Sequence, residues 1–112
     1  MSNVAKKNPW QDSAPVFAAL GDATRLKLLA ALCAGGALSI AQLTTGTAIT
    51  RQAVTKHLLV LADAGLVHDS WQGRERLWEL EPSRLDEARR SLDAIAAQWD
   101  QALARLKHFV ER

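Results

Sequence analysis

The segment TRQAVTKH, residues 50–57, brings together side chains that can read double-stranded DNA. An arginine guanidinium can bond two atoms of a guanine edge at once, and a glutamine amide can do the same on adenine. Threonine can bond a base or a phosphate, and lysine is a natural phosphate partner. The candidate DNA-binding residues in this segment are Thr50, Arg51, Gln52, Thr55, Lys56 and His57. Their types predict recognition through hydrogen bonds and charge.

Two of these assignments have alternatives. His57 can contact a phosphate, or it can hold its helix against the preceding turn. The whole group can also be a solvated helix face, because exposed faces are commonly charged. The order of the surrounding elements, set out below, favours DNA contact.

A second basic group lies in QGRER, residues 72–76. Gly73 permits a tight hairpin turn. Arg74 and Arg76 are two residues apart, so on a strand they point to the same face. Such a tip can reach the DNA backbone or minor groove beside the main contact, although Glu75 weakens its positive field. The alternative is that these are ordinary hairpin charges.

The chain lacks the residue sets that catalysis needs. No nucleophile, base and orienting group are evident, no Gly-rich phosphate loop is present, and no metal-ligand set is complete. We therefore predict that it is not an enzyme and carries no cofactor. The single cysteine, Cys33, excludes a disulfide within the chain. It ends an apolar helix, so we expect it to be buried; the alternative, a redox sensor, needs an exposed thiol.

The length of 112 residues suits one domain, without internal repeats. A net charge of +2 is only a weak indication of an anionic partner. Polar residues and glycines interrupt the uncharged stretch 28–50, and no apolar segment follows the first lysines, so neither a membrane span nor secretion is predicted. We expect a cytoplasmic protein with a flexible segment over 1–12 and one domain over 13–112.

Capping residues and glycines divide the first half of this domain into four short helices. Their expected limits are Ser13 to Gly21, Asp22 to Gly35, a capping box at Ser39 and Gln42, and Thr50 to Gly65. The core face of the second helix is expected to hold Leu26, Leu29, Ala30 and Leu32. The segments LVHDSW and RLWEL follow as two strands of a hairpin.

A long helix is predicted after the hairpin, over 85–110, with Ser83 and Asp86 spaced as a cap. Its apolar residues follow at steps of three and four, close to a heptad seam. This seam is too long for so small a core to cover, so a homodimer is favoured over packing within one subunit. The expected dimerisation residues are Phe17, Leu92, Ile95, Trp99, Leu103 and Leu106. Trp71 and Trp78 are expected in the core or the seam.

Two helices, a short turn, a helix and a hairpin predict a mainly α winged helix-turn-helix with a small β-hairpin wing. In this fold the second helix of the pair enters the major groove, and here it begins at Thr50. The segments FAALGDATRLKLLAAL, TRQAVTKHLLVLADAGLV and GRERLWEL resemble the ArsR/SmtB family of dimeric bacterial transcriptional repressors. The resemblance runs from Val16 to Leu80, and the last helix fits as the family's dimerisation helix.

The resemblance also implies metal-sensing positions that can be compared one by one. LSIAQL places Ser39 and Ala41 where the family's cysteine pair would stand. His108 and Glu111 match one half of the terminal-helix zinc site, but the upstream half holds isoleucine and alanine, which cannot bind zinc. We therefore expect no metal site. The tail is similar to the branch of the family that lacks the classical metal sites.

The function implied by the resemblance is repression by a homodimer bound to an inverted-repeat operator. Its expected partners are double-stranded DNA and a second copy of the chain. The alternative is a winged-helix protein-interaction module without DNA specificity of its own, which would form a tight complex with a protein partner and show no salt-dependent DNA binding. A small-molecule effector, and activation in place of repression, are left open.

Overall fold

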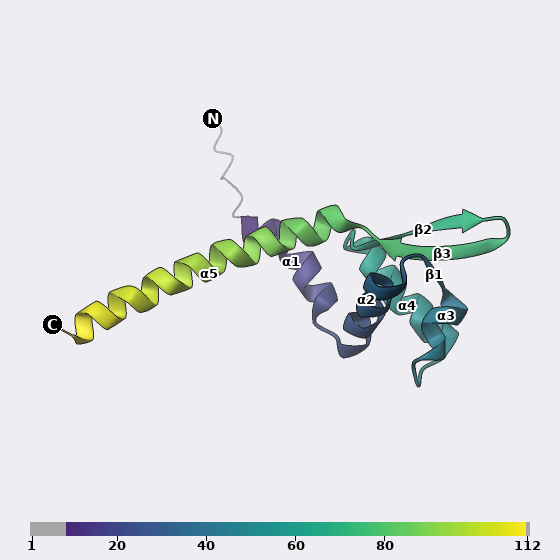
Figure 1. Ribbon diagram of the computed structural model, residues 1–112, viewed down its shortest axis with the longest axis horizontal. Helices are drawn as coiled ribbons and strands as arrows, with labels where there is room; N and C mark the ends of the chain where they lie inside the picture. The colour runs from purple at the N-terminus through teal and green to yellow at the C-terminus, as the bar shows by residue number, and fades with distance from the viewer. Residues whose placement is uncertain (1–8, 112) are drawn as a thin grey trace, which may run out of the picture.

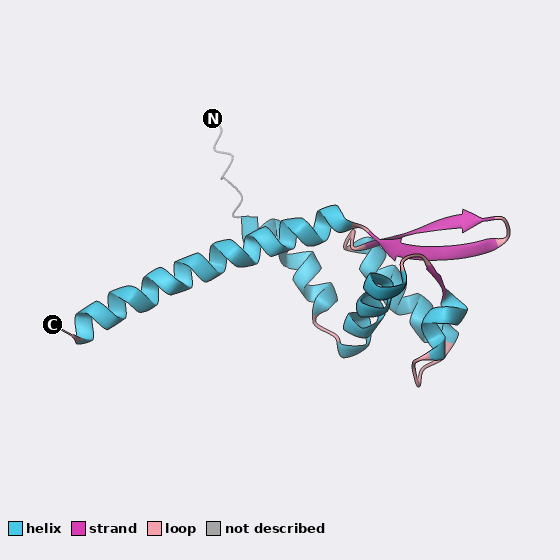
Figure 2. Ribbon diagram, viewed as in Figure 1, coloured by secondary structure: helices cyan, strands magenta, loops and turns pink. Residues whose placement is uncertain are grey.

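The computed structural model describes residues 9–111, and over this range the chain forms five helices and a small antiparallel sheet (Figures 1 and 2). In chain order the elements are α1 (Pro9–Leu20), α2 (Ala23–Gly35), β1 (Leu38–Ser39), α3 (Ile40–Thr45), α4 (Arg51–Asp63), β2 (Val67–Gln72), β3 (Glu75–Leu80) and α5 (Pro82–Val110). Apart from β1, this order is the one predicted for a winged helix-turn-helix. Figure 1 shows α5 leaving the body as a long rod, while the β2–β3 hairpin projects from the other side.

The sheet is built on the predicted hairpin. β2 and β3 are antiparallel, with Val67 opposite Leu80 at the base. Gly73 at the tip has φ of 64°, a left-handed conformation that glycine adopts without strain. β1 adds a third strand at the free edge of β3, giving the order β1–β3–β2. A strand of two residues has no detectable periodicity, which is why the sequence did not predict it.

The core forms around one face of α4. Val54, Leu58 and Leu61 are fully buried, and their spacing of three and four residues places them on the same side of the helix. The other large side chains that are almost wholly buried are Val16, Leu28, Leu32, Leu66 and Trp78. The core position expected for Trp78 is therefore confirmed, whereas Trp71 is 65% exposed on the hairpin and belongs to no core.

The helix ends around α4 are as the sequence predicts. The side-chain oxygen of Thr50 accepts a hydrogen bond from the backbone N–H of Ala53 at 3.1 Å. Ser39 and Gln42 form the reciprocal capping box at the start of α3. After α4, Gly65 has φ of 78°, and the backbone N–H groups that follow the helix bond back to carbonyls of its last turn. Both ends of α4 are therefore fixed by local hydrogen bonds.

The prediction that Ser13 caps the first helix is wrong. α1 begins at Pro9, where a proline costs no helix hydrogen bond, and Asp12 lies in the first turn. Ser13 lies within α1 and its side chain is buried, with its hydroxyl 2.8 Å from that of Ser91 on α5. Of the segment 1–12 expected to be flexible, residues 1–8 lie outside the described residues and the rest belongs to α1.

The start of the last helix also differs from the prediction. α5 begins at Pro82, and the residue before it, Glu81, is the N-cap. The hydroxyl of Ser83 bonds to the Glu81 carboxylate at 3.4 Å and caps nothing. Proline is favoured in the first helical turn, and this preference moves the start ahead of the serine.

Three residues of α2 expected inside the protein lie on its outer side. Leu26 is 50% exposed, and Ala30 and Cys33 are also exposed. The buried stripe runs through Leu28 and Leu32, and the helical turn places the other three away from it. Leucine and alanine suit an exposed helix position through their propensity alone, so their apolar character misled the prediction.

Candidate nucleic-acid interface

The outward face of α4 carries two of the predicted contact residues. Gln52 and Lys56 are four residues apart, both exposed, and opposite the face that holds Val54 and Leu58 in the core. A helix with one face buried and the other presenting an amide and an ammonium can lie in a DNA groove without losing its packing. The structure therefore brings these two side chains together on one accessible surface.

Two of the three residues at the flank of this face use their side chains in bonds within the helix. Thr50 is exposed, but its oxygen is used in the cap of α4. The hydroxyl of Thr55 donates to the backbone oxygen of Arg51 at 2.9 Å, which leaves its lone pairs to accept from a ligand. Arg51 is exposed in the first turn, beside backbone N–H groups that have no partner within the helix. This end of α4 can attract a phosphate.

His57 lies away from this surface, against the junction of α1 and α2. Its Nδ1 is 3.4 Å from a guanidinium nitrogen of Arg25 and 3.9 Å from a carboxylate oxygen of Asp22. The geometry supports the second interpretation of His57, that it anchors the helix. A contact between His57 and a phosphate would need the imidazole to turn away from both Asp22 and Arg25.

Asp22 and Arg25 were not predicted as part of this region. The Asp22 carboxylate caps α2 by accepting from the backbone N–H of Arg25 at 2.9 Å, and this bond holds the pKa of Asp22 below its usual value. The Arg25 side chain also donates to backbone oxygens of Ala18 and Ala19 at the end of α1. The segment GDATR carried part of the signal, because an aspartate at the N-cap predicts a bond to the backbone N–H three residues later, here that of Arg25.

The two hairpin arginines differ in what they contact. Arg76 pairs with Asp69 across the strands, with Nε 2.7 Å from the carboxylate, and its guanidinium lies 4.6 Å from the centre of the Trp78 ring. Its hydrogen bond holds the pKa of Asp69 below the usual value, so this carboxylate is charged at neutral pH. Arg74 is exposed at the tip, and no carboxylate of the described residues lies within ion-pair distance of it. Of the two arginines, Arg74 is therefore the one whose charge is available to a DNA phosphate.

The apolar seam of α5 is exposed along most of the helix. Leu85 and Ala88 pack on the core, but beyond Ser91 the helix leaves the body of the protein. The expected dimerisation residues on this part are Leu92, Ile95, Trp99, Leu103 and Leu106, which are between 37% and 66% exposed. Phe17 differs, because it is half-buried and packs against the core of its own subunit.

Other kinds of site have little support in the described residues. In the range 9–111, no three side chains of His, Cys, Asp or Glu are grouped so that they could hold a metal ion. His108 and Glu111 are both exposed near the end of α5. No helix in the described part of the chain has the length and apolar character needed to cross a bilayer.

Known proteins are similar to this chain in sequence and in the arrangement of helices and strands. A sequence model of the helix-turn-helix domain matches residues 20–69. The HTH-type transcriptional regulator Rv2034 of Mycobacterium tuberculosis is 38% identical over 85 residues, spanning 76% of this chain and 76% of that protein. An ArsR-like transcriptional regulator from Rhodococcus sp. RHA1 has a TM-score of 0.76 at 37% identity, over 89% of this chain and 93% of that one.

The homodimeric winged helix-turn-helix DNA-binding domain of Mb0332 from Mycobacterium bovis shares the fold. Its TM-score is 0.62 at 21% identity, with 92% of this chain and 95% of that chain covered. The match includes nearly all of this chain, so the long last helix belongs to the common architecture.

Proposed function

Because the chain belongs to the ArsR family of winged helix-turn-helix transcriptional regulators, we propose that it is a homodimeric repressor of an inverted-repeat operator. Two copies of α4 would enter successive major grooves about 34 Å apart on one side of the DNA. Transcription would fall because the bound dimer covers promoter DNA. The outward pair Gln52 and Lys56 on a helix held at both ends is the observation that carries this proposal.

The seam of α5 supports the dimer. The radius of gyration is 18.7 Å, whereas a compact chain of this length has about 13 Å. The projecting helix exposes Leu92, Trp99 and Leu106 on one side, and a monomer would leave this apolar row in water. A second copy presents the same row, and the two can cover each other about a two-fold axis. The homodimeric Mb0332 domain has the same architecture.

The roles of Gln52 and Lys56 predict different losses. Gln52→Ala is expected to lower affinity for the operator by about tenfold and leave random DNA unchanged, because a bidentate base contact discriminates between sequences. Lys56→Ala is expected to lower the affinity for the operator and for random DNA to the same degree, because phosphates carry no sequence information. Titrations of both DNAs at several salt concentrations measure the difference. Equal losses on the two DNAs for Gln52→Ala would remove its base-reading role.

The hairpin gives a second prediction with opposite signs. Arg74→Ala is expected to lower the affinity for all DNA by about threefold. It is also expected to lower the slope of the salt dependence by the amount that about one phosphate contact contributes. Asp69→Asn is expected to strengthen binding and steepen the salt dependence, because it releases Arg76 from its carboxylate. The slope of log affinity against log salt concentration measures both. If neither variant changes the slope, the hairpin does not contact DNA.

A further inference from the structure

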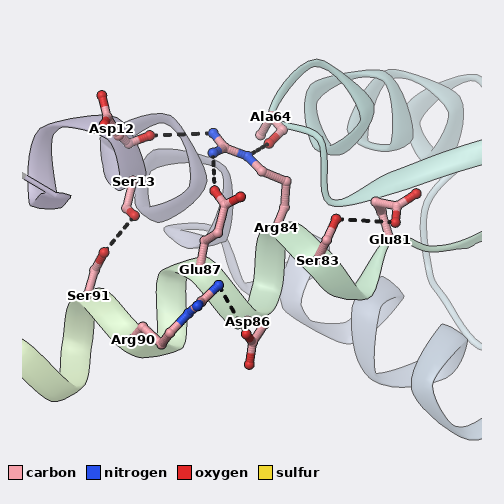
Figure 3. Close-up of polar contacts among 10 residues, drawn as sticks. All are labelled: Asp12, Ser13, Ala64, Glu81, Ser83, Arg84, Asp86, Glu87, Arg90 and Ser91. Carbon is pink, nitrogen blue, oxygen red and sulfur yellow. Dashed lines mark hydrogen bonds and ion pairs between the residues drawn. The ribbon is translucent and has the colours of Figure 1, made fainter.

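Arg84, on the first turns of α5, joins three separate parts of the chain (Figure 3). Its Nε donates to the backbone oxygen of Ala64 at 3.3 Å, and one terminal nitrogen donates to the backbone oxygen of Asp12 at 3.4 Å. The other terminal nitrogen bonds to the carboxylate of Glu87, one turn further along α5, at 2.8 Å. A planar guanidinium with its donors in a fixed fork suits three acceptors in different directions.

The first of these acceptors is the end of the proposed DNA-reading helix. Ala64 is the C-cap of α4, where backbone oxygens lack partners within the helix and the helix dipole favours a positive charge. The next residue, Gly65, makes room for the arginine stem. A Cβ at Gly65 would lie 2.9 Å from Cγ of Arg84, so any larger residue would push the stem away.

The second acceptor, the backbone oxygen of Asp12, belongs to a different helix, α1. Asp12 lies in α1, which packs along α5 through contacts that include the buried hydroxyl pair of Ser13 and Ser91 (Figure 3). α5 itself carries the exposed seam of the proposed dimer. Arg84 therefore ties the end of the DNA-reading helix to α1 and to α5, the helix that carries the proposed dimer seam.

We propose that Arg84 is a positioning residue that sets the angle of α4 to the dimer axis, and thereby the spacing of the two half-sites. The inference rests on the proposed dimeric DNA reader. A dimer reads an inverted repeat only when its two helices are separated and tilted to match successive grooves. A side chain that ties α4 to the dimer helices controls this geometry without contacting DNA.

Neighbouring arginines show what an ordinary surface charge looks like on the same helix. Arg89 and Arg90 pair with Asp86, within α5, and their side chains are 73% and 68% exposed. The Arg84 side chain is 29% exposed and reaches two other elements. Arg89 is therefore a matched control that removes the same charge without touching α4.

The test compares wild type, Arg84→Gln, Arg84→Lys and Arg89→Gln. The affinity of each protein is measured for the operator that wild type selects, for one isolated half-site, and for operators whose half-sites are moved by one or two base pairs. Sedimentation and circular dichroism establish that each variant is folded and dimeric. Arg84→Lys keeps the charge and the stem over Gly65 but loses the fork, so it provides the comparison if the glutamine variant does not fold.

Both Arg84 variants are expected to bind the operator about tenfold more weakly, which corresponds to the loss of one charge-assisted hydrogen bond. Their affinity for the isolated half-site is expected to change little. Their preference for the original spacing is expected to broaden, while Arg89→Gln keeps the wild-type profile. Folded Arg84 variants with the wild-type spacing profile would overturn the inference. If wild type selects no inverted repeat, the proposed function fails instead, so the two failures are distinguishable.

Discussion

Trp99→Glu is expected to convert the protein into a monomer and to lower its affinity for the operator by about a hundredfold or more. Trp99 lies in the middle of the exposed seam of α5 and is 66% exposed in the single chain. In the dimer its ring would be buried, and a carboxylate there would lose its water without gaining a partner. Each monomer would then bind one half-site alone, and the gain from binding two linked half-sites would disappear.

Sedimentation and operator titration measure this effect, and the half-site supplies an internal control because its affinity is expected to change little. Gln101→Glu is the matched variant. It adds the same charge two residues along, where the helical turn places it on the opposite side of α5 from the seam. A dimeric Trp99→Glu protein with normal operator affinity would show that the dimer forms through another surface.

Leu58→Ala is expected to lower the free energy of unfolding by about 2–5 kcal/mol, because it leaves a cavity where the side chain was fully packed. Leu58 is 0% exposed and lies on the core face of α4. Whole domains are stable by only about 5–15 kcal/mol, so this loss is a large fraction of the total. Urea unfolding at equal protein concentrations measures the difference.

Leu59→Ala on the same helix is the control for this loss. Leu59 is 46% exposed, so its truncation is expected to change stability by no more than about 0.5 kcal/mol. The contrast between neighbouring leucines tests the assignment of faces on α4. Similar losses at both positions would mean that Leu59 is also buried in the protein in solution, and the outward face of the helix would have to be redrawn.

The parts predicted well from the sequence are those governed by local rules. The caps of α3 and α4, the glycine after α4 and the hairpin turn depend on residues within a few positions of one another. The face of α4 follows from apolar spacing, which is why the outward positions of Gln52 and Lys56 agree with expectation.

The parts that were missed depend on contacts between distant segments. Ser13 has the type of a cap, but its partner Ser91 is 78 residues away, and no local pattern reveals that bond. The ion pair of Arg76 with Asp69 joins the two strands of the hairpin, and the spacing of the arginines does not reveal it. Arg84 reaches backbone oxygens, which have no sequence signature. His57 was left between two roles because its neighbours Asp22 and Arg25 come from another helix.

Selection of random duplex DNA by the purified, metal-free protein tests the central claim most directly. The salt concentration should be near the physiological value, where binding driven by counterion release alone is weak. The account predicts enrichment of an imperfect inverted repeat whose half-sites are centred about one helical turn apart. A folded, dimeric protein that enriches no sequence would contradict the account, and its partner would then have to be sought among proteins.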